Sequence, residues 1–238
     1  MSWWLSGGIS AGDCVAAYQA IGAANIAASK VNLNDPGTND IDVGTDPAFD
    51  AATGWSFNGS THYLGLSSYS IVDTPFTVVA RMNANIAAAA TSIICGLNNI
   101  STTGSARRNW AIKAEQYLNT GKLGISAYQG TGDVASDLNT PSGDSVVIIT
   151  RSGTSVIFYS GASSSEKSVT INYSNAKTGF YIGASLWDAT VVDRFTGYIA
   201  AISYYHTVIT SDQRAAITAA LLSGGIPKHF MHYQRMRG

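Results

Sequence analysis

The stretch that decides the fold is VVIITRSGTSVIFY, residues 146–159. Two β-branched runs enclose a small Ser-Gly dipeptide, which is the pattern of a tight β-hairpin. In the chain before this hairpin, apolar side chains alternate with polar or small ones at a period of two, as they do in half-buried strands. The alternating segments are residues 76–82, 109–115 and 122–128. These runs, and similar short ones between turn residues, predict an antiparallel two-sheet sandwich of the jelly-roll type.

The same alternation predicts which further segments are strands and which side chains form the core. The additional strands are expected at residues 15–18, 55–57, 92–96, 168–171, 180–183 and 195–205. The expected core consists of Phe76, Val78, Ile112, Leu123, Ile125, Val147, Ile149, Phe158, Ile182, Ile199 and Tyr204.

One helix is predicted close to the C-terminal end. Thr210 and Gln213 form a capping box in front of residues 214–222. Residues 22–31 are rich in alanine and are compatible with one or two turns of helix. Residues 34–54 are rich in Asp, Pro, Gly, Thr and Asn, which predicts one long irregular loop.

The length of 238 residues is compatible with a single domain over residues 1–238, with an N-terminal arm at 1–14 and a basic tail at 227–238. Only 12% of the residues are charged, and the net charge of −1 argues against nucleic acid as a partner. No apolar run reaches the roughly 18 residues that cross a bilayer. The first residues show no signal peptide, so secretion by that route is not expected. Cys14 and Cys95 each lie among apolar neighbours, which favours two buried thiols over a disulfide.

Several motifs carry a resemblance to a known family. They are WSFNGS (55–60), YL (63–64), FTV (76–78), YIGA (181–184), FTGYI (195–199) and SYY (203–205), followed by the short helix. In this order, over about residues 50–222, they resemble the laminin-G-like jelly roll of the concanavalin A-like lectin and glucanase superfamily. The opening motifs WLSGGI (4–9), VAAYQ (15–19) and NL (32–33) resemble uncharacterised laminin-G-like proteins of bacteriophages.

The resemblance implies a scaffold used for sugar binding, adhesion, glycoside hydrolysis or virion structure, and the fold alone does not choose among them. The hydrolases of the superfamily carry Glu-x-Asp-x-x-Glu on one strand, because two carboxyl groups must flank the glycosidic bond. This chain has only Glu115 and Glu166, and they lie in different elements. The sequence therefore predicts a protein that is not an enzyme.

Two functions stay open for such a module. One is a structural or recognition protein on the surface or tail of a bacteriophage-type virion, made in the host cytoplasm, whose partners are other virion subunits or copies of itself. The alternative is a calcium-dependent carbohydrate-binding lectin whose partner is a surface glycan.

The candidate glycan site combines aromatic side chains with polar acceptors in loops. Trp187 and Asp188 lie in a polar segment between two strands, while Tyr117, Asn119 and Tyr128 offer a second cluster. Trp187 is equally compatible with capping the end of the sandwich.

Calcium is the one cofactor for which the sequence offers ligands. Asp40, Asp42, Asp46 and Asp50 follow one another in a glycine-containing segment, and calcium takes six to eight oxygen ligands from such groups. The alternative is that these aspartates form ordinary Asx turns.

Both ends of the chain are candidate contact surfaces. Trp3 and Trp4 bring large apolar area to a terminus, and they either contact a partner subunit or pack on the domain's own sheet. The tail mixes aromatic and basic side chains of the kinds enriched at interfaces, unless it is simply solvated. The tail residues expected to make contacts are Phe230, Tyr233, Arg235 and Arg237.

Overall fold

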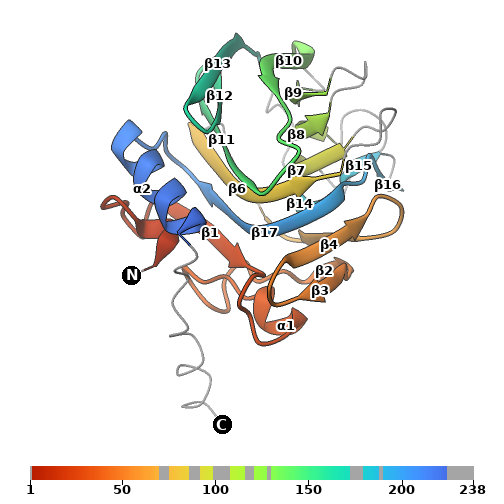
Figure 1. The fold of residues 1–238 in the computed structure, drawn as a ribbon. Coiled ribbons are helices and arrows are strands. Elements are labelled where there is room, and N and C mark those ends of the chain that lie inside the picture. Colours follow the sequence, from red (N-terminus) through yellow and green to blue (C-terminus); the bar gives the residue numbers. More distant parts are fainter. Residues whose placement is uncertain are drawn as a thin grey trace.

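The protein folds into two antiparallel β-sheets packed face to face, with one C-terminal helix lying against the outside of the larger sheet (Figure 1). The computed structural model describes residues 2–69, 75–85, 92–98, 108–115, 121–127, 130–171, 179–187 and 190–223. The predicted all-β jelly-roll class with a short C-terminal helix is confirmed.

The eight-stranded sheet has the order β13-β12-β11-β6-β17-β4-β3, and β1 pairs with β17 beside this path. Its strands are β1 (Cys14–Gln19), β3 (Ala48–Asp50), β4 (Gly54–Asn58), β6 (Phe76–Ala84), β11 (Ser145–Ser152), β12 (Ser155–Ser160), β13 (Ser163–Ser168) and β17 (Thr196–Tyr205).

The seven-stranded sheet has the order β10-β9-β8-β7-β14-β5-β2. Its strands are β2 (Val43–Thr45), β5 (Tyr63–Leu66), β7 (Ser92–Asn98), β8 (Arg108–Glu115), β9 (Lys122–Ala127), β10 (Gly132–Asn139) and β14 (Gly179–Ile182). The remaining elements are the hairpin of β15 (Ser185–Trp187) and β16 (Thr190–Val192), and the helices η1 (Trp3–Leu5), α1 (Ile26–Ser29) and α2 (Ser211–Leu222).

The main core lies between the two sheets. Every side chain predicted to be inside is buried, which confirms the strand phase used above. The Phe76 ring from the larger sheet stacks on the Trp110 ring from the smaller one, with ring centroids 4.7 Å apart. The two free cysteines are also buried, as predicted, with Cys95 in this core.

A second apolar cluster covers the outer face of the eight-stranded sheet. Helix α2 begins at the predicted capping box of Thr210 and Gln213, and it packs with η1 over β1, β6, β11 and β17 (Figure 1). Trp3 and Trp4 are buried in this cluster, where Trp3 Nε1 donates to Gln19 Oε1 at 2.9 Å. The chain therefore covers both tryptophans itself, which removes the reason for placing them at an interface with a partner.

Two predictions about local structure are wrong. The segment 34–54 is not one irregular loop, because it contains β2 and β3, three-residue edge strands that pair with β5 and β4. Hydrogen bonds to β12 place a strand at Ser163–Ser168 instead of 168–171. The sequence SSSEKS has no apolar residue, so alternation could not reveal this strand.

A polar seam joins the edges of the two sheets where β10 meets β13. Ser165 Oγ donates to an Asp137 carboxylate oxygen at 3.0 Å, and Lys167 Nζ lies 2.8 Å from that same oxygen. Within the part of the chain that the structure describes, no helix has the length and apolar character to span a membrane.

Candidate functional site

The outer face of the seven-stranded sheet carries one row of residues in direct register. Crossing the sheet from β10 to β2, the row is Asp133, Ser126, Ala111, Gly96, Tyr181, Gly65 and Val43. Small residues fill its middle, whereas polar and aromatic side chains lie on both sides. Because neighbouring strands are about 4.8 Å apart, adjacent members of the row are true neighbours in space.

Strand β8 contributes two further polar side chains to this face. Trp110 and Ile112 point into the core, so Asn109, Ala111 and Lys113 lie on the opposite face. We call the set of Asn109, Lys113, Ser126, Asp133 and Tyr181 the polar strip. Asn109 is 0% exposed and Lys113 3% exposed, although side chains of these types are mostly found at the surface.

The charges of the polar strip are internally paired. Lys113 Nζ lies 3.1 Å from Asp133 Oδ1, and the Ser126 hydroxyl donates a hydrogen bond to the same oxygen. A buried cation is stable only when it is paired in this way. The pair leaves this side of the strip polar but without a net charge.

Asn109 has no hydrogen-bond partner for either polar atom of its amide. Both its Oδ1 and its Nδ2 are buried and unpaired. Asn32, also 0% exposed, shows the ordinary arrangement: its Nδ2 donates to Thr38 O at 2.8 Å and to Val15 O at 3.1 Å, and its Oδ1 accepts from Ala17 N at 3.0 Å. A buried amide without partners costs about 1–3 kcal/mol, and in Asn109 both polar atoms of the side chain are in this state.

A pair of tyrosines forms the other side of the strip. Tyr181 lies between Gly96 and Gly65 on the neighbouring strands, and its ring leans across Gly65 towards Tyr63. The two ring centroids are 6.1 Å apart at an angle of 30°. Burial raises the pKa of Tyr181 to about 12, so its hydroxyl is a neutral hydrogen-bonding group at pH 7.

The hairpin of β15 and β16 lies beside one end of the strip. Strand β15 contacts β7 and β8, and Ile93 N donates to Asp193 O at 3.1 Å just after the hairpin. Trp187 ends β15, where its backbone pairs with Thr190. The structure therefore brings the segment of the predicted Trp187 site to the polar strip.

The other predicted glycan residues, Asp188, Tyr117, Asn119 and Tyr128, lie outside the described residues. Strand β8 ends at Glu115 and β9 ends at Ala127, at opposite ends of an antiparallel pair.

Each of the four aspartates of the predicted calcium site binds a different partner within the chain. Asp40 accepts from Asn32 N at 2.7 Å, Asp42 accepts from Ser67 N at 2.8 Å, and Asp46 pairs with Lys30 at 3.0 Å. Asp50 accepts from two backbone N–H groups that follow it in the chain, as in an Asx turn. In the described ranges, no three His, Cys, Asp or Glu side chains gather as a metal site.

The predicted contact residues of the tail, Phe230, Tyr233, Arg235 and Arg237, also lie outside the described residues.

Sequence reasoning missed every member of the polar strip as a functional residue. The available signal was that Asn109 and Lys113 occupy the outward phase of a strand whose inward phase is apolar. What the sequence could not supply was the register that aligns β8 with β9, β10 and β14.

Comparisons with known proteins identify the fold. No protein-family model matches the chain, and no curated protein matches it. Among solved structures, Trypanosoma rangeli sialidase in complex with sialic acid superposes with a TM-score of 0.62 at 14% identity, over 90% of this chain and 34% of that one. A mutant of that sialidase displaying trans-sialidase activity gives 0.58 at 13% identity, over 88% and 33%. The likeness shows that this chain shares its two-sheet β-sandwich fold with part of the sialidase chain.

A smaller structure also matches. The CBM40 of Ruminococcus gnavus IT-sialidase bound to α2,3-sialyllactose gives a TM-score of 0.47 at 13% identity, over 75% of this chain and 97% of that one.

These structures correct the prediction that the chain is not an enzyme. Sialidases are enzymes, and this fold forms part of their chains. The present chain spans about a third of the length of the two sialidases, and at this identity the likeness shows the fold alone.

Proposed function

We propose that this chain is a carbohydrate-recognition domain that binds a glycan along the polar strip. The observation that carries the proposal is the Asn109 amide, which is buried without a hydrogen-bond partner on a face where Lys113, Asp133 and Ser126 are paired. An amide offers one acceptor and two N–H donors, which suits adjacent hydroxyl groups of a sugar ring. Because Asn109 is 0% exposed, a bound sugar would supply the missing hydrogen bonds once the groups that cover the amide move aside.

The rest of the strip suits the same class of ligand. Tyr181 and Tyr63 offer an aromatic surface with hydroxyl groups, and a sugar ring has both an apolar face and polar edges. Gly96 and Ala111 keep the middle of the row free of long side chains. Because Lys113 is neutralised by Asp133, the strip lacks the cation surplus that a phosphate backbone requires.

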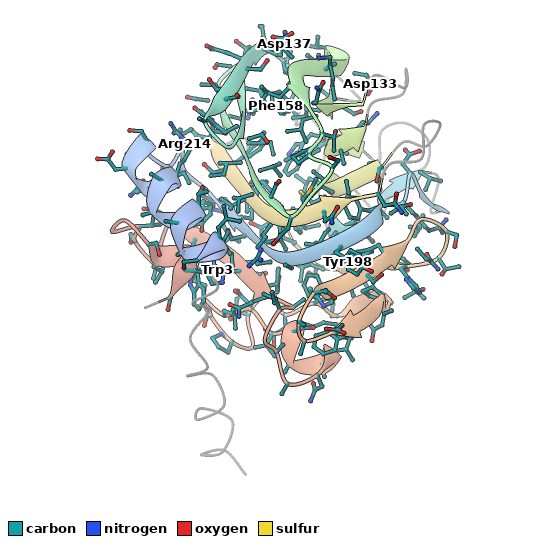
Figure 2. All side chains as sticks on the ribbon, viewed as in Figure 1. Trp3, Asp133, Asp137, Phe158, Tyr198 and Arg214 are labelled. Atoms are coloured by element: carbon teal, nitrogen blue, oxygen red, sulfur yellow. The ribbon has the colours of Figure 1, made fainter. Side chains whose placement is uncertain are left out.

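Binding to an array of neutral and acidic glycans, followed by calorimetry on the glycans retained, tests this proposal. We expect Asn109→Leu and Tyr181→Leu to lower affinity at least about tenfold, since each removes contacts that the chain cannot replace. Two matched controls lie on the other sheet. Asn83→Leu changes a partly exposed amide, and Tyr198→Leu changes a tyrosine that is 41% exposed on β17 (Figure 2).

The controls should bind like the unaltered chain, and circular dichroism should show all four variants folded. Unchanged affinity in a folded Asn109→Leu variant would overturn the site. Failure of the unaltered, folded chain to bind any glycan on the array would overturn the function.

The virion role remains a prediction that the fold does not address, and detection of the chain in purified virions would test it. Calcium dependence also remains a prediction. Repeating the calorimetry in EDTA and then in excess calcium tests it, and loss of binding in EDTA with recovery in calcium would support it.

A further inference from the structure

Arg194 differs from the other described cations in having no partner. Every other lysine or arginine whose side chain the structure describes makes a hydrogen bond, an ion pair or another interaction. Arg194 is only partly exposed, and its Nε is buried without an acceptor. A guanidinium group carries five donors in a fork that matches an anion with two oxygens, so this arginine can bind one.

The chain places Arg194 beside one end of the polar strip. Asp193 O accepts from Ile93 N of β7 at 3.1 Å, and Phe195 N donates at 2.8 Å to Gly183 O, which follows β14. These bonds hold the backbone on both sides of Arg194 beside the start of β7 and the end of β14. Ile93 is paired with Lys113 on the next strand. Two strand spacings therefore separate the backbone of Arg194 from that of Lys113, about 10 Å, which a ligand of two sugar rings can span.

Asp133 and Asp193, the two acidic groups that the structure describes near Arg194, are already engaged. Asp133 accepts from both Lys113 and Ser126. Asp193 has an interaction of its own, and its φ of 52° is unusual for a residue with a side chain. The charge that complements Arg194 must then come from outside these residues.

We propose that Arg194 is a specificity residue that binds an anionic substituent, a carboxylate, sulfate or phosphate, on a glycan held at the polar strip. This inference rests on the proposed function, because the strip must hold the sugar for Arg194 to select its charge. Such a contact is a charge-assisted hydrogen bond, which favours the charged ligand over its neutral counterpart by about tenfold or more.

The test uses an array that carries each carboxylated glycan both as the free acid and as its methyl ester, together with sulfated and phosphorylated glycans and their unsubstituted forms. We expect the chain to prefer the charged member of at least one pair. Arg194→Gln should reduce the affinity for that member about tenfold and leave the affinity for its neutral form unchanged. Arg194→Lys should recover part of the preference, and Arg214→Gln, the same charge change on α2, is the matched control.

Salt gives a second readout. Raising ionic strength should weaken binding of the charged member by the unaltered chain more than by Arg194→Gln. Equal affinity for charged and neutral members, or a charge preference that survives in Arg194→Gln, would overturn the role of Arg194 while leaving the glycan site intact. Loss of all binding in Asn109→Leu together with selective loss in Arg194→Gln would support both proposals.

Discussion

The two sheets of this sandwich have very different outer faces. On the eight-stranded sheet, the outward phase is apolar where α2 and η1 cover it, with Val79, Ile148 and Tyr205 packed beneath the helix. On the seven-stranded sheet, the outward phase carries Ser126 and Asn109, which are equally buried but polar. The first face is satisfied by the chain's own apolar groups, whereas the second keeps at least one amide unsatisfied.

The difference separates an apolar face that the chain itself covers from the polar face at which we propose that a glycan binds. An apolar outer face gains free energy from a helix that removes it from water, about 25 cal/mol per Å² of apolar area. Covering a polar outer face gains no free energy unless the hydrogen bonds lost to water are replaced by hydrogen bonds within the protein. For the Asn109 amide, none of these hydrogen bonds is replaced. Burial alone therefore does not distinguish the two faces, whereas the chemistry of the buried side chains does, apolar on the first and polar on the second.

The largest difference in the free energy of unfolding is expected between two buried amides, Asn109 and Asn32, when each is replaced by leucine. Asn109→Leu should raise the free energy of unfolding by about 1 kcal/mol or more, because it removes an unsatisfied buried amide. Asn32→Leu should lower it by about 3 kcal/mol or more, because Ala17 N, Val15 O and Thr38 O lose their partner. Urea denaturation measures both values.

A destabilised Asn109→Leu variant would mean that the amide supports the fold. The polar strip would then lose the observation that marks it as a binding site.

Two substitutions in α2 test whether this helix packs on the eight-stranded sheet. Ile217→Ala should lower the free energy of unfolding by about 2–5 kcal/mol, since Ile217 is fully buried against the larger sheet. Leu222→Ala is the control from the last residue of the same helix, where the side chain is 47% exposed, and it should change stability by less than about 0.5 kcal/mol. Equal effects in urea denaturation would show that α2 does not pack as described.

The sequence predicted the strands whose alternation extends over many residues. Residues 76–82 and 146–159 alternate long enough to define a face, and the structure places their inward side chains in the core. Strands β2 and β3 have three residues each, and β13 has no apolar residue, so hydrogen bonding to a neighbouring strand defines them. Their existence depends on partners far away in the sequence.

The candidate site was less predictable than the fold. The sequence favoured Trp187 because it stands among polar residues, and the structure brings its hairpin to β7 and β8. Alternation along β8 places Asn109 on the same face as Ala111, but Ser126 becomes their neighbour only through strand register, which no local pattern encodes. The burial of Trp3 likewise depends on Gln19 and on a helix at the other end of the chain.

The seam between the sheets should respond to pH. Hydrogen bonds from Lys167 and Ser165 lower the pKa of Asp137 below its usual 3.8. A lowered folded-state pKa contributes stability above pH 3.8 and loses it as the pH falls through the folded-state value. The melting temperature of the unaltered chain should therefore exceed that of Asp137→Asn at pH 7, and this small difference should disappear towards pH 2.

Asp35→Asn, which changes an exposed carboxylate, is the control for the loss of one negative charge. A difference between the unaltered chain and Asp137→Asn that stays constant with pH would show that the seam does not depend on this carboxylate.

The reactivity of the two thiols compares two parts of the molecule, because Cys14 lies beneath α2 and η1 and Cys95 lies between the sheets. Cys14 belongs to the cluster under α2 and η1, and Cys95 belongs to the main core. Burial raises the pKa of Cys14 to about 12 and that of Cys95 further, so neither thiol reacts at pH 8 until the structure around it opens. The cluster under α2 and η1 is smaller than the main core, so it should open more often than the whole sandwich. We expect a thiol reagent to label Cys14 in Cys95→Ser about tenfold faster than Cys95 in Cys14→Ser, and Ile217→Ala to accelerate the Cys14 reaction more than the Cys95 reaction. Equal labelling rates in both backgrounds would mean that cover and sandwich open together, and the outer face under α2 would then be an inseparable part of the core.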